Sequence, residues 1–399
     1  MKYLWIGVCL SENQRRFILD GGGKILSANV SQDALLAGLE KNGVVFDSIN
    51  AHRFPDFPQF KYKVIPEERW SRNGVSRDVG VGYKNKKYIS HLYKTKALRR
   101  EARAWATENA NNDVTVIVYS MHSPFMACAA EVKKLIPSAK INVIVPDLPQ
   151  YMDLHMSKIK RMLKAVDWIR IKKLMRSVDK YILYSKHMAK FLKLNDGDWT
   201  VMEGSFDPGF VAPAEKKSPP QTISIMYSGV LNTSFGIPQL LDAFALIDDE
   251  RFELWFTGGG NAVDLINERA AKDPRIHNYG YLPSRNDLLI KQQQATMLIS
   301  PRRPDKEASS YCFPSKLFEY MASGNPVLSC RLGGIPDEYF DYLIEMKSTC
   351  PEDIRDAIMR VASMTEEERH AIGEGGKKFV LENKNNVKQA ELMLSFIGG

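Results

Sequence analysis

Residues 313–329 have the sequence FPSKLFEYMASGNPVLS and predict a helix followed by a buried strand. Pro314 and Ser315 are typical of the start of a helix, Gly324 is typical of its end, and an apolar run follows. Glu319 then lies in the first turns of the helix, where exposed backbone N–H groups and the positive end of the helix dipole can hold a phosphate. A helix that binds phosphate and also carries a carboxylate for ribose hydroxyls suits a nucleotide diphosphate.

Five other segments in the second half of the chain have the pattern of strands, turns and a helix, and they precede residues 313–329 in order. They are 227–231 (YSGVL), 236–244 (GIPQLLDAF), 254–260 (LWFTGGG), 279–283 (YGYLP) and 297–301 (MLISP). Each is a weak signal alone, but the ordered set is specific. Over roughly the last 180 residues the chain resembles retaining GT-B glycosyltransferases of the family 4 type, especially bacterial enzymes that build surface polysaccharides.

The resemblance implies an α/β fold of the GT-B class, with two Rossmann-like domains that face each other across a cleft. Independently of it, alternating strand and helix signals in both halves predict parallel sheets wrapped by helices. Residues 208–220 predict a domain boundary, because residues 213–220 within them carry no apolar pattern. We expect an acceptor-side domain at 1–208, a nucleotide-sugar domain at 221–385, and a helix at 386–399 that crosses back to the first domain.

Residues 52–82 are the exception to this alternation in the first half. They are rich in proline, aromatic and charged residues without clear periodicity. Because the segment is long for a loop, it indicates an insertion on the acceptor side. Around it, strands are predicted at 3–9, 44–49, 114–119, 141–145 and 180–184, and helices at 32–41, 88–109, 125–135 and 186–194. In the second half, helices are predicted at 238–247, 263–271, 285–294, 315–323 and 351–359.

The resemblance also implies which residues hold a nucleotide sugar. Glu319 would bind the ribose hydroxyls, and the segment from Tyr281 to Pro283 would contact the base. Gly22 and Gly23 would let the backbone approach the donor phosphate. The other members of the predicted site are Gly229, Asn232, Gly259, Leu282, Pro314, Ser315, Lys316 and Leu317. A structural role stays open for each of them, such as a helix-surface carboxylate, a core tyrosine or a flexible glycine loop.

The chain departs from the family pattern where the leaving group needs positive charge. Many members have an arginine and a lysine where this chain has Val230 and Phe235. Because transfer leaves negative charge on a diphosphate, donors must gather around it. We expect Arg302 and Lys316 to supply the missing cations. A surface turn and a solvated helix lysine are the alternative interpretations.

Three further side chains are candidates for catalysis. A family glutamate falls on Tyr311 here, and Glu307, four residues earlier, can substitute for it. His122 and Asp147 follow predicted strands and are expected at the cleft, because the ends of parallel strands face it. Neither has a firm claim to be a general base, and a loop histidine is a common structural role.

Composition excludes several classes of protein. With 399 residues, 44% hydrophobic and 26% charged, the sequence is that of an ordinary globular protein with room for two cores. No apolar run approaches the roughly 18 residues of a membrane span. The five cysteines have no metal-ligand spacing, which predicts reduced thiols, no metal site and a cytoplasmic protein. Cys312 lies near the proposed site, and we expect it to have a packing role.

The formal net charge of +8 is concentrated in residues 84–103 and 158–176. The second segment interleaves eight basic residues with apolar ones and a tryptophan, which suits the inner face of an anionic membrane. A solvated basic face packed onto the domain is an equal alternative. No recognisable nucleic-acid-binding module accompanies the charge, so nucleic acid is not expected as a partner.

From the sequence we therefore expect an enzyme, a glycosyltransferase that moves a sugar from a nucleotide-diphosphate donor to a glycan or lipid-linked acceptor. The resemblance implies retention of configuration and no cofactor other than the donor substrate. The alternatives are a sugar-nucleotide epimerase of the same fold and a catalytically weak scaffold protein. A dehydrogenase is disfavoured because neither half begins with a strand followed by G-x-G-x-x-G. The donor, acceptor and linkage stay open.

Overall fold

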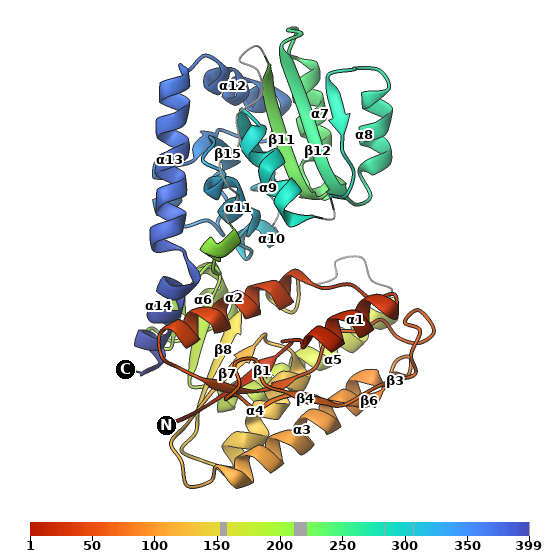
Figure 1. Cartoon of the computed structure of the whole chain (residues 1–399), viewed down its shortest axis with the longest axis vertical. Coiled ribbons are helices and arrows are strands. Elements are labelled where there is room, and N and C mark those ends of the chain that lie inside the picture. The colour runs from red at the N-terminus through yellow and green to blue at the C-terminus, as the bar shows by residue number, and fades with distance from the viewer. Residues whose placement is uncertain (152–157, 211–221, 283, 306, 399) are drawn as a thin grey trace. The chain divides into compact units, whose positions relative to one another are not determined.

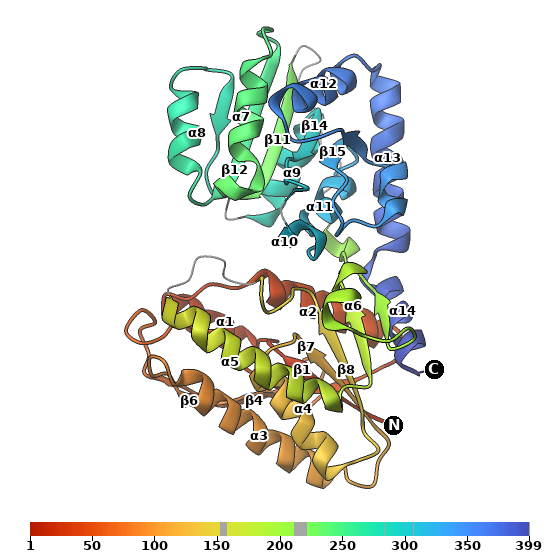
Figure 2. The same ribbon diagram turned by 180° about the vertical axis from the view of Figure 1, so that it is seen from behind.

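The computed structural model describes residues 1–151, 158–210, 222–282, 284–305 and 307–398. The chain divides into two compact units, one formed by residues 1–205 with residues from Asn386 onward and the other by Phe206–Asn385 (Figures 1 and 2). This division falls three residues before the predicted end of the first domain at 208. The C-terminal helix α14 (Asn386–Gly398) belongs to the first unit.

The first unit is built on an eight-stranded sheet with the order β10-β9-β8-β7-β1-β2-β5-β4. Every neighbouring pair is parallel except β4 with β5. The strands are β1 (Lys2–Gly7), β2 (Phe46–Asn50), β4 (Glu68–Trp70), β5 (Asp78–Gly80), β7 (Val114–Tyr119), β8 (Lys140–Val145), β9 (Lys180–Leu183) and β10 (Trp199–Val201). The helices are α1 (Glu12–Asp20), α2 (Ser27–Lys41), α3 (Ser90–Glu108), α4 (Ser123–Leu135), α5 (Lys158–Leu174) and α6 (His187–Leu192).

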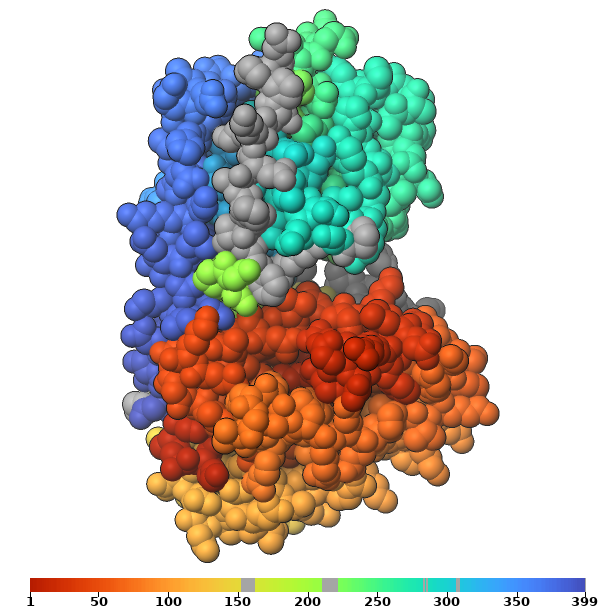
Figure 3. All heavy atoms as spheres, viewed as in Figure 1, coloured from red at the N-terminus to blue at the C-terminus, as the bar shows by residue number. Residues whose placement is uncertain are grey.

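The predicted insertion at 52–82 is only partly a loop. It contains β4 and β5, which extend the main sheet, and β3 (Val64–Ile65), which pairs with β6 (Tyr83–Lys84) in a small antiparallel sheet. Because β5 pairs with β2 and β4 pairs with β5, the insertion is anchored on the core sheet. Figure 3 shows that the N-terminal part of the chain, coloured red to orange, forms most of the visible face of this unit.

The second unit is built on a six-stranded parallel sheet with the order β13-β12-β11-β14-β15-β16. The strands are β11 (Ile223–Val230), β12 (Phe252–Gly259), β13 (Ile276–Asn278), β14 (Met297–Ser300), β15 (Val327–Cys330) and β16 (Ile344–Met346). The helices are α7 (Ile237–Ala245), α8 (Val263–Ala270), α9 (Arg285–Gln294), α10 (Glu307–Ser310), α11 (Lys316–Ala322), α12 (Pro351–Ala362) and α13 (Glu366–Asn383). Short 3₁₀ helices are η1 (Met175–Ser177), η2 (Pro208–Phe210), η3 (Thr233–Phe235) and η4 (Asp337–Asp341).

The strand order of the second unit reverses direction between β11 and β14. Strands added after β11 first extend one side of the sheet, as β12 and β13, and then the other, as β14, β15 and β16. In open α/β sheets ligands bind outside the carboxyl ends of the strands at such a switch point. A ligand-binding site is therefore expected at the residues that follow β11 and β14.

Helix α14 packs on α2 within the first unit. The Nδ2 of Asn386 donates to the carbonyl of Ala34 at 3.0 Å, and the Nδ2 of Asn42 donates to the carbonyl of Val387 at 3.0 Å. A Cβ on Gly38 would lie 2.1 Å from the Asn386 carbonyl oxygen, so only glycine allows the helices this close.

Helices α1 and α13 had no clear signal in the sequence. The nine residues of α1 have few apolar positions, although Ser11 caps the helix and Gln14 completes a capping box. Helix α13 contains three glycines, which disfavour a helix on propensity alone. A Cβ at Gly373 would lie 2.1 Å from the carbonyl oxygen of Gly324, so tertiary packing requires a glycine there.

Candidate functional site

Helix α11 is fixed against the carboxyl end of β11 by a buried tyrosine. The hydroxyl of Tyr320 donates to the carbonyl of Ser228 at 2.7 Å and accepts from the Ser228 N–H at 2.9 Å. The Ser228 hydroxyl in turn accepts from the Nε2 of Gln292 in α9 at 2.8 Å. Burial raises the pKa of Tyr320, so the phenol keeps its proton. This network sets the position of the whole of α11 at the switch point.

The side chains of Lys316 and Glu319 lie together on α11. The Nζ of Lys316 is 3.0 Å from the Oε2 of Glu319, and both side chains are half-buried. The stem of Lys316 passes over Gly229, where a Cβ would lie 3.5 Å from the lysine Cε. Three predicted site residues, Gly229, Lys316 and Glu319, are thus brought together at the carboxyl end of β11.

The first turn of α11 satisfies part of its own backbone. The Leu317 N–H donates to the Pro314 carbonyl at 2.8 Å, and the Phe318 N–H donates to the Ser315 carbonyl at 3.3 Å. Leu317 and Pro314 are buried, whereas Ser315 is exposed. The Leu317 N–H that we expected to face a phosphate is therefore occupied. Within the described part of the chain, the N–H groups of Ser315 and Lys316 have no hydrogen-bond partner.

Arg302 follows β14 and lies over Phe235. Its guanidinium carbon is 4.5 Å from the ring centroid, and its Nη1 is 3.5 Å from the Sγ of Cys312. Phe235, where many members of the resembled family have a lysine, is thus in contact with the guanidinium of an arginine that follows β14. Val230 is 59% exposed and offers no charge. Neighbouring Arg303 instead forms an ion pair with Asp305 at 2.6 Å.

The glycine turn after β12 lies beside the end of β11. Gly258 has φ of 130°, and a Cβ there would lie 1.8 Å from the Gly229 carbonyl oxygen. Gly259 is exposed, and a Cβ there would meet no atom within 4 Å. Asn232 caps the 3₁₀ helix η3, because its Oδ1 accepts from the N–H of Ser234 at 2.9 Å. The side-chain oxygen of Asn232 is therefore already hydrogen-bonded within this turn.

The other predicted residues of this unit differ in exposure, and some of them lie outside the described part. Tyr281 is 78% exposed and Leu282 is half-buried, while Pro283 lies outside the described residues. Glu307 begins α10, but its side chain is also outside the described part. Tyr311 is half-buried.

The predicted residues of the first unit lie at different strand ends. His122 precedes α4, where its ring makes an edge contact with Phe125 at 5.9 Å. Asp147 follows β8 and its charge acts on the buried hydroxyls of Tyr119 and Tyr184. Burial raises the pKa of Tyr119 to about 12.

The triple glycine does not offer free backbone donors. The N–H groups of Gly21, Gly22 and Gly23 all donate to carbonyls of the end of α1. A Cβ at Gly21 would lie 2.2 Å from the Phe60 ring, and Gly22 has φ of 80°. These glycines are explained by the turn and its packing, which argues against the expected contact of Gly22 and Gly23 with a phosphate.

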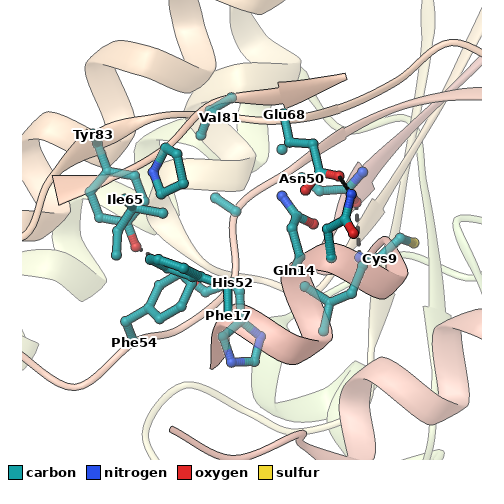
Figure 4. A pocket seen from close by; sticks show the side chains of 15 residues that line it. Cys9, Gln14, Phe17, Asn50, His52, Phe54, Ile65, Glu68, Val81 and Tyr83 are labelled. Atoms are coloured by element: carbon teal, nitrogen blue, oxygen red, sulfur yellow. Dashed lines mark hydrogen bonds between the residues drawn. The ribbon is translucent and has the colours of Figure 1, made fainter. Parts of the chain in front are cut away.

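A pocket of about 230 Å³ lies at the carboxyl ends of β1, β2 and β5, and no residue of it was predicted as a site residue (Figure 4). Its walls come from α1, from the residues after β1 and β2, and from the insertion. The aromatic residues at 52–82 were a signal for it, since they had indicated an acceptor-side insertion. The lining residues are Cys9, Leu10, Asn13, Gln14, Phe17, Asn50, Ala51, His52, Phe54, Ile65, Pro66, Glu68, Gly80, Val81 and Tyr83.

A second, open groove of about 240 Å³ lies between α3 and α5 and is strongly basic. It is lined by Leu92, Thr95, Lys96, Arg99, Arg103 and Arg170. The buried carboxylate of Glu131 pairs with both Arg99 and Arg103, so one negative charge is shared by two of the four cations of this groove. On α5, Met162, Val166 and Ile169 are each at least 60% exposed. The apolar side of this helix is thus not wholly packed on the domain.

In the described residues, no cluster of three or more histidine, cysteine, aspartate or glutamate side chains has the arrangement of a metal site. Among the helices of that part of the chain, none combines the length and apolar character that crossing a membrane requires.

Comparisons with known proteins agree with the geometry of the second unit. Residues 222–364 match the family model described as glycosyl transferases group 1. This match identifies a glycosyltransferase domain, as the sequence predicted. No curated protein matches the sequence.

Solved structures are similar to the whole chain. HepE of Anabaena, in complex with UDP, is 11% identical with a TM-score of 0.66, and the match covers 100% of both chains. The lipopolysaccharide outer core galactosyltransferase WaaB is 15% identical with a TM-score of 0.64, covering 100% of this chain and 99% of that one. A UDP-forming α,α-trehalose-phosphate synthase of Burkholderia xenovorans, in complex with glucose-6-phosphate, is 11% identical with a TM-score of 0.64, covering 100% of both chains. At these identities the likeness establishes the fold, which is the predicted GT-B class.

Proposed function

Because residues 222–364 form a glycosyl transferases group 1 domain within a chain of GT-B fold, we propose that this protein transfers a sugar from a UDP-sugar to a glycan or lipid-linked acceptor. The anomeric carbon exchanges its bond to the diphosphate for a bond to an acceptor hydroxyl, and the hydroxyl proton leaves with the diphosphate. We propose retention of configuration and a role in surface polysaccharide synthesis. The likeness to a UDP-bound structure and to a lipopolysaccharide galactosyltransferase supports this choice of donor and product.

The observation that carries the proposal is the gathering of charge at the switch point. Lys316 lies over Gly229 at the end of β11, and Arg302 follows β14. A diphosphate bound between these strand ends would meet both cations and the N–H groups at the start of α11. Preorganised donors of this kind stabilise the charge that develops on a leaving group. The reaction then needs no metal ion, and the nucleotide sugar is the only small molecule that we propose for this unit.

Glu319 is the proposed ligand of the ribose hydroxyls. Its carboxylate is held on α11 by Lys316 at 3.0 Å, so one residue pair can reach both the sugar and the phosphates of a nucleotide. A carboxylate accepts hydrogen bonds from two hydroxyls at once. Tyr281, being largely exposed, is proposed to contact the base.

An anionic membrane surface is proposed as a further partner. The basic groove between α3 and α5 and the exposed apolar residues of α5 support this proposal, because interfacial helices combine these two features. A lipid-linked acceptor would then be presented at the unit that carries α5.

The test is a UDP-release assay with a panel of UDP-sugars and acceptor glycosides. We expect release of UDP by the wild type with at least one donor, and a roughly hundredfold lower turnover for Lys316→Ala, which removes one preorganised donor. Lys272→Ala is the matched control, since Lys272 is exposed and paired with Glu268 in α8. Equal turnover of the two variants would contradict the proposed role of Lys316. An inactive wild type across the panel would favour a scaffold protein.

A further inference from the structure

We propose that the pocket at the carboxyl ends of β1, β2 and β5 binds one uncharged sugar ring of the acceptor, and that it selects against phosphorylated sugars. The inference rests on the proposed function and names the class of acceptor for it. The position supports a substrate site, because ligands of parallel α/β sheets bind outside the carboxyl ends of the strands. The volume of about 230 Å³ is below the roughly 300–1,000 Å³ of pockets for drug-sized ligands, which fits a single ring.

One wall of the pocket is aromatic and aliphatic. Tyr83, Ile65 and Phe54 lie on this side in Figure 4, and Phe17 joins Phe54 with ring centroids 6.1 Å apart. Phe54 also contacts Tyr83 at 6.5 Å. Phe17 and Phe54 are half-buried, so their rings keep area for a ligand. The C–H face of a pyranose ring is apolar and gains by packing on such rings.

The opposite wall is polar and can read hydroxyl groups. Gln14, Asn50 and Glu68 lie on this side in Figure 4. Asn13 donates through its Nδ2 to one carboxylate oxygen of Glu68 at 3.2 Å, which leaves the other oxygen as an acceptor. Asn50 is held by the N–H of Cys9 at 2.9 Å and by the Ser48 hydroxyl at 2.7 Å.

Gln14 adds a donor to this wall. Its Oε1 accepts from the Ser11 N–H at 3.4 Å, while its Nε2 donates to no other group in the described part of the chain. A sugar hydroxyl is both donor and acceptor, so a wall with one amide donor and one carboxylate acceptor suits it.

The charge of the pocket separates it from a phosphate site. None of the fifteen lining residues is a lysine or arginine, and Glu68 contributes a negative charge. His52 is neutral at pH 7, because burial and the nearby Lys94 charge lower its pKa to about 4. Lys94 does not line the pocket, and its Nζ donates to the His52 carbonyl at 3.0 Å and lies 5.3 Å from the Tyr83 ring centroid. A phosphate here would face the Glu68 carboxylate, and no lining side chain carries a positive charge to compensate, which disfavours binding.

The experiment is saturation-transfer NMR of the full chain with methyl glycosides of glucose, galactose, mannose and N-acetylglucosamine, and with the corresponding 6-phosphates. At least one neutral glycoside is expected to bind saturably, and its 6-phosphate to bind at least tenfold more weakly. Phe54→Leu should weaken the neutral ligand by roughly three- to tenfold and Glu68→Gln by roughly tenfold or more. Phe57→Leu and Glu67→Gln are matched controls that lie within three residues of Phe54 and Glu68 in the sequence but do not line the pocket.

Several outcomes would overturn the inference. They are no saturable binding of any neutral glycoside, tighter binding of the 6-phosphate, or equal binding by the pocket variants and their controls. UDP affinity is measured on the same samples, because it depends on the other unit. Retained UDP binding with any of these outcomes refutes the pocket alone, whereas a wild type that binds no UDP refutes the proposed donor. Thermal melting of each variant excludes unfolding as the cause.

Discussion

Arg302 is, at the scale of a single residue, the side chain on which the charge balance of the proposed diphosphate site depends. The sequence indicated a missing cation at Phe235, and the guanidinium of Arg302 lies 4.5 Å above that ring. The cation–π contact holds the guanidinium over the ring, and the N–H groups other than the one directed at Cys312 can donate to an oxygen. The positive charge that is missing at Phe235 is thus supplied beside that residue by Arg302, which follows β14.

Arg302→Gln should lower turnover roughly a hundredfold, because it removes one charged donor from the leaving group. Arg303→Gln is the control, since this neighbour is paired with Asp305. Arg302→Lys should recover only part of the loss, because an ammonium cannot stack and bond as a guanidinium does. Steady-state kinetics with the best donor measures this, and equal rates for the Arg302 and Arg303 glutamine variants would contradict it.

His52 predicts how stability depends on pH. Burial and the Lys94 charge lower its pKa from 6.5 to about 4 in the folded chain, so the unfolded chain binds more protons between these values. Stability from this residue is therefore full above pH 6.5 and is lost as pH falls toward 4, by about 3 kcal/mol in total. Lys94, with a pKa lowered to about 8, stays protonated throughout that window.

The measurement is urea unfolding of wild type and His52→Gln at pH 7 and pH 4.5. The wild type should lose about 2 kcal/mol more than the variant between the two conditions. If both lose the same free energy, His52 is not buried in its neutral form.

Helix α5 is the element whose surface makes a prediction about a partner. Lys172 and Lys173 are exposed in its last turn, and Val166 and Ile169 are exposed beside them. Each basic residue near an anionic surface contributes on the order of 1 kcal/mol, screened by salt. Changing Lys172 and Lys173 to Gln should therefore weaken binding to anionic vesicles by about 2 kcal/mol at low salt.

Vesicle co-sedimentation at low and high salt tests the α5 surface. Lys347→Gln with Lys378→Gln removes the same charge from exposed positions of the other unit and should have little effect. A wild type that does not sediment with anionic vesicles even at low salt would show that α5 is only a solvated face.

At the scale of elements, a helix or strand formed by one continuous segment was predictable from the sequence. A feature assembled from distant segments was not. Helix α11 and strand β14 each coincide with one continuous apolar pattern, so the residues next to them in the sequence are enough to predict where each element begins and ends. The pocket is different, because the pairing of β1 with β2 and of β2 with β5 is what brings residues near 9–17, 50–54 and 65–83 together. Helix α13 escaped prediction since Gly373 is required by its contact with Gly324 rather than by helix propensity.

For the molecule as a whole, the sequence predicted two α/β units and a terminal helix, because strand and helix signals alternate throughout. In the second unit, Gly229, Lys316 and Glu319 lie together at the switch point, and their binding of a nucleotide stays a prediction. The hydrogen bonds that occupy the N–H groups of Gly22 and Gly23 were not predictable, because they depend on the turn geometry after α1. Backbone satisfaction of this kind is visible only in three dimensions.

The central claim is that the second unit holds a nucleoside diphosphate at the ends of β11 and β14 and at α11. Calorimetric titration of UDP into the wild type and the Glu319→Gln variant tests this claim most directly. The control is Glu374→Gln, the same substitution at a glutamate of α13 that is paired with Lys377. We predict saturable binding by the wild type and the control, and a loss of about 1–3 kcal/mol for Glu319→Gln, the value of hydrogen bonds to a charged group. Absence of UDP binding by the wild type, or an affinity unchanged in a folded Glu319→Gln variant, would contradict the account.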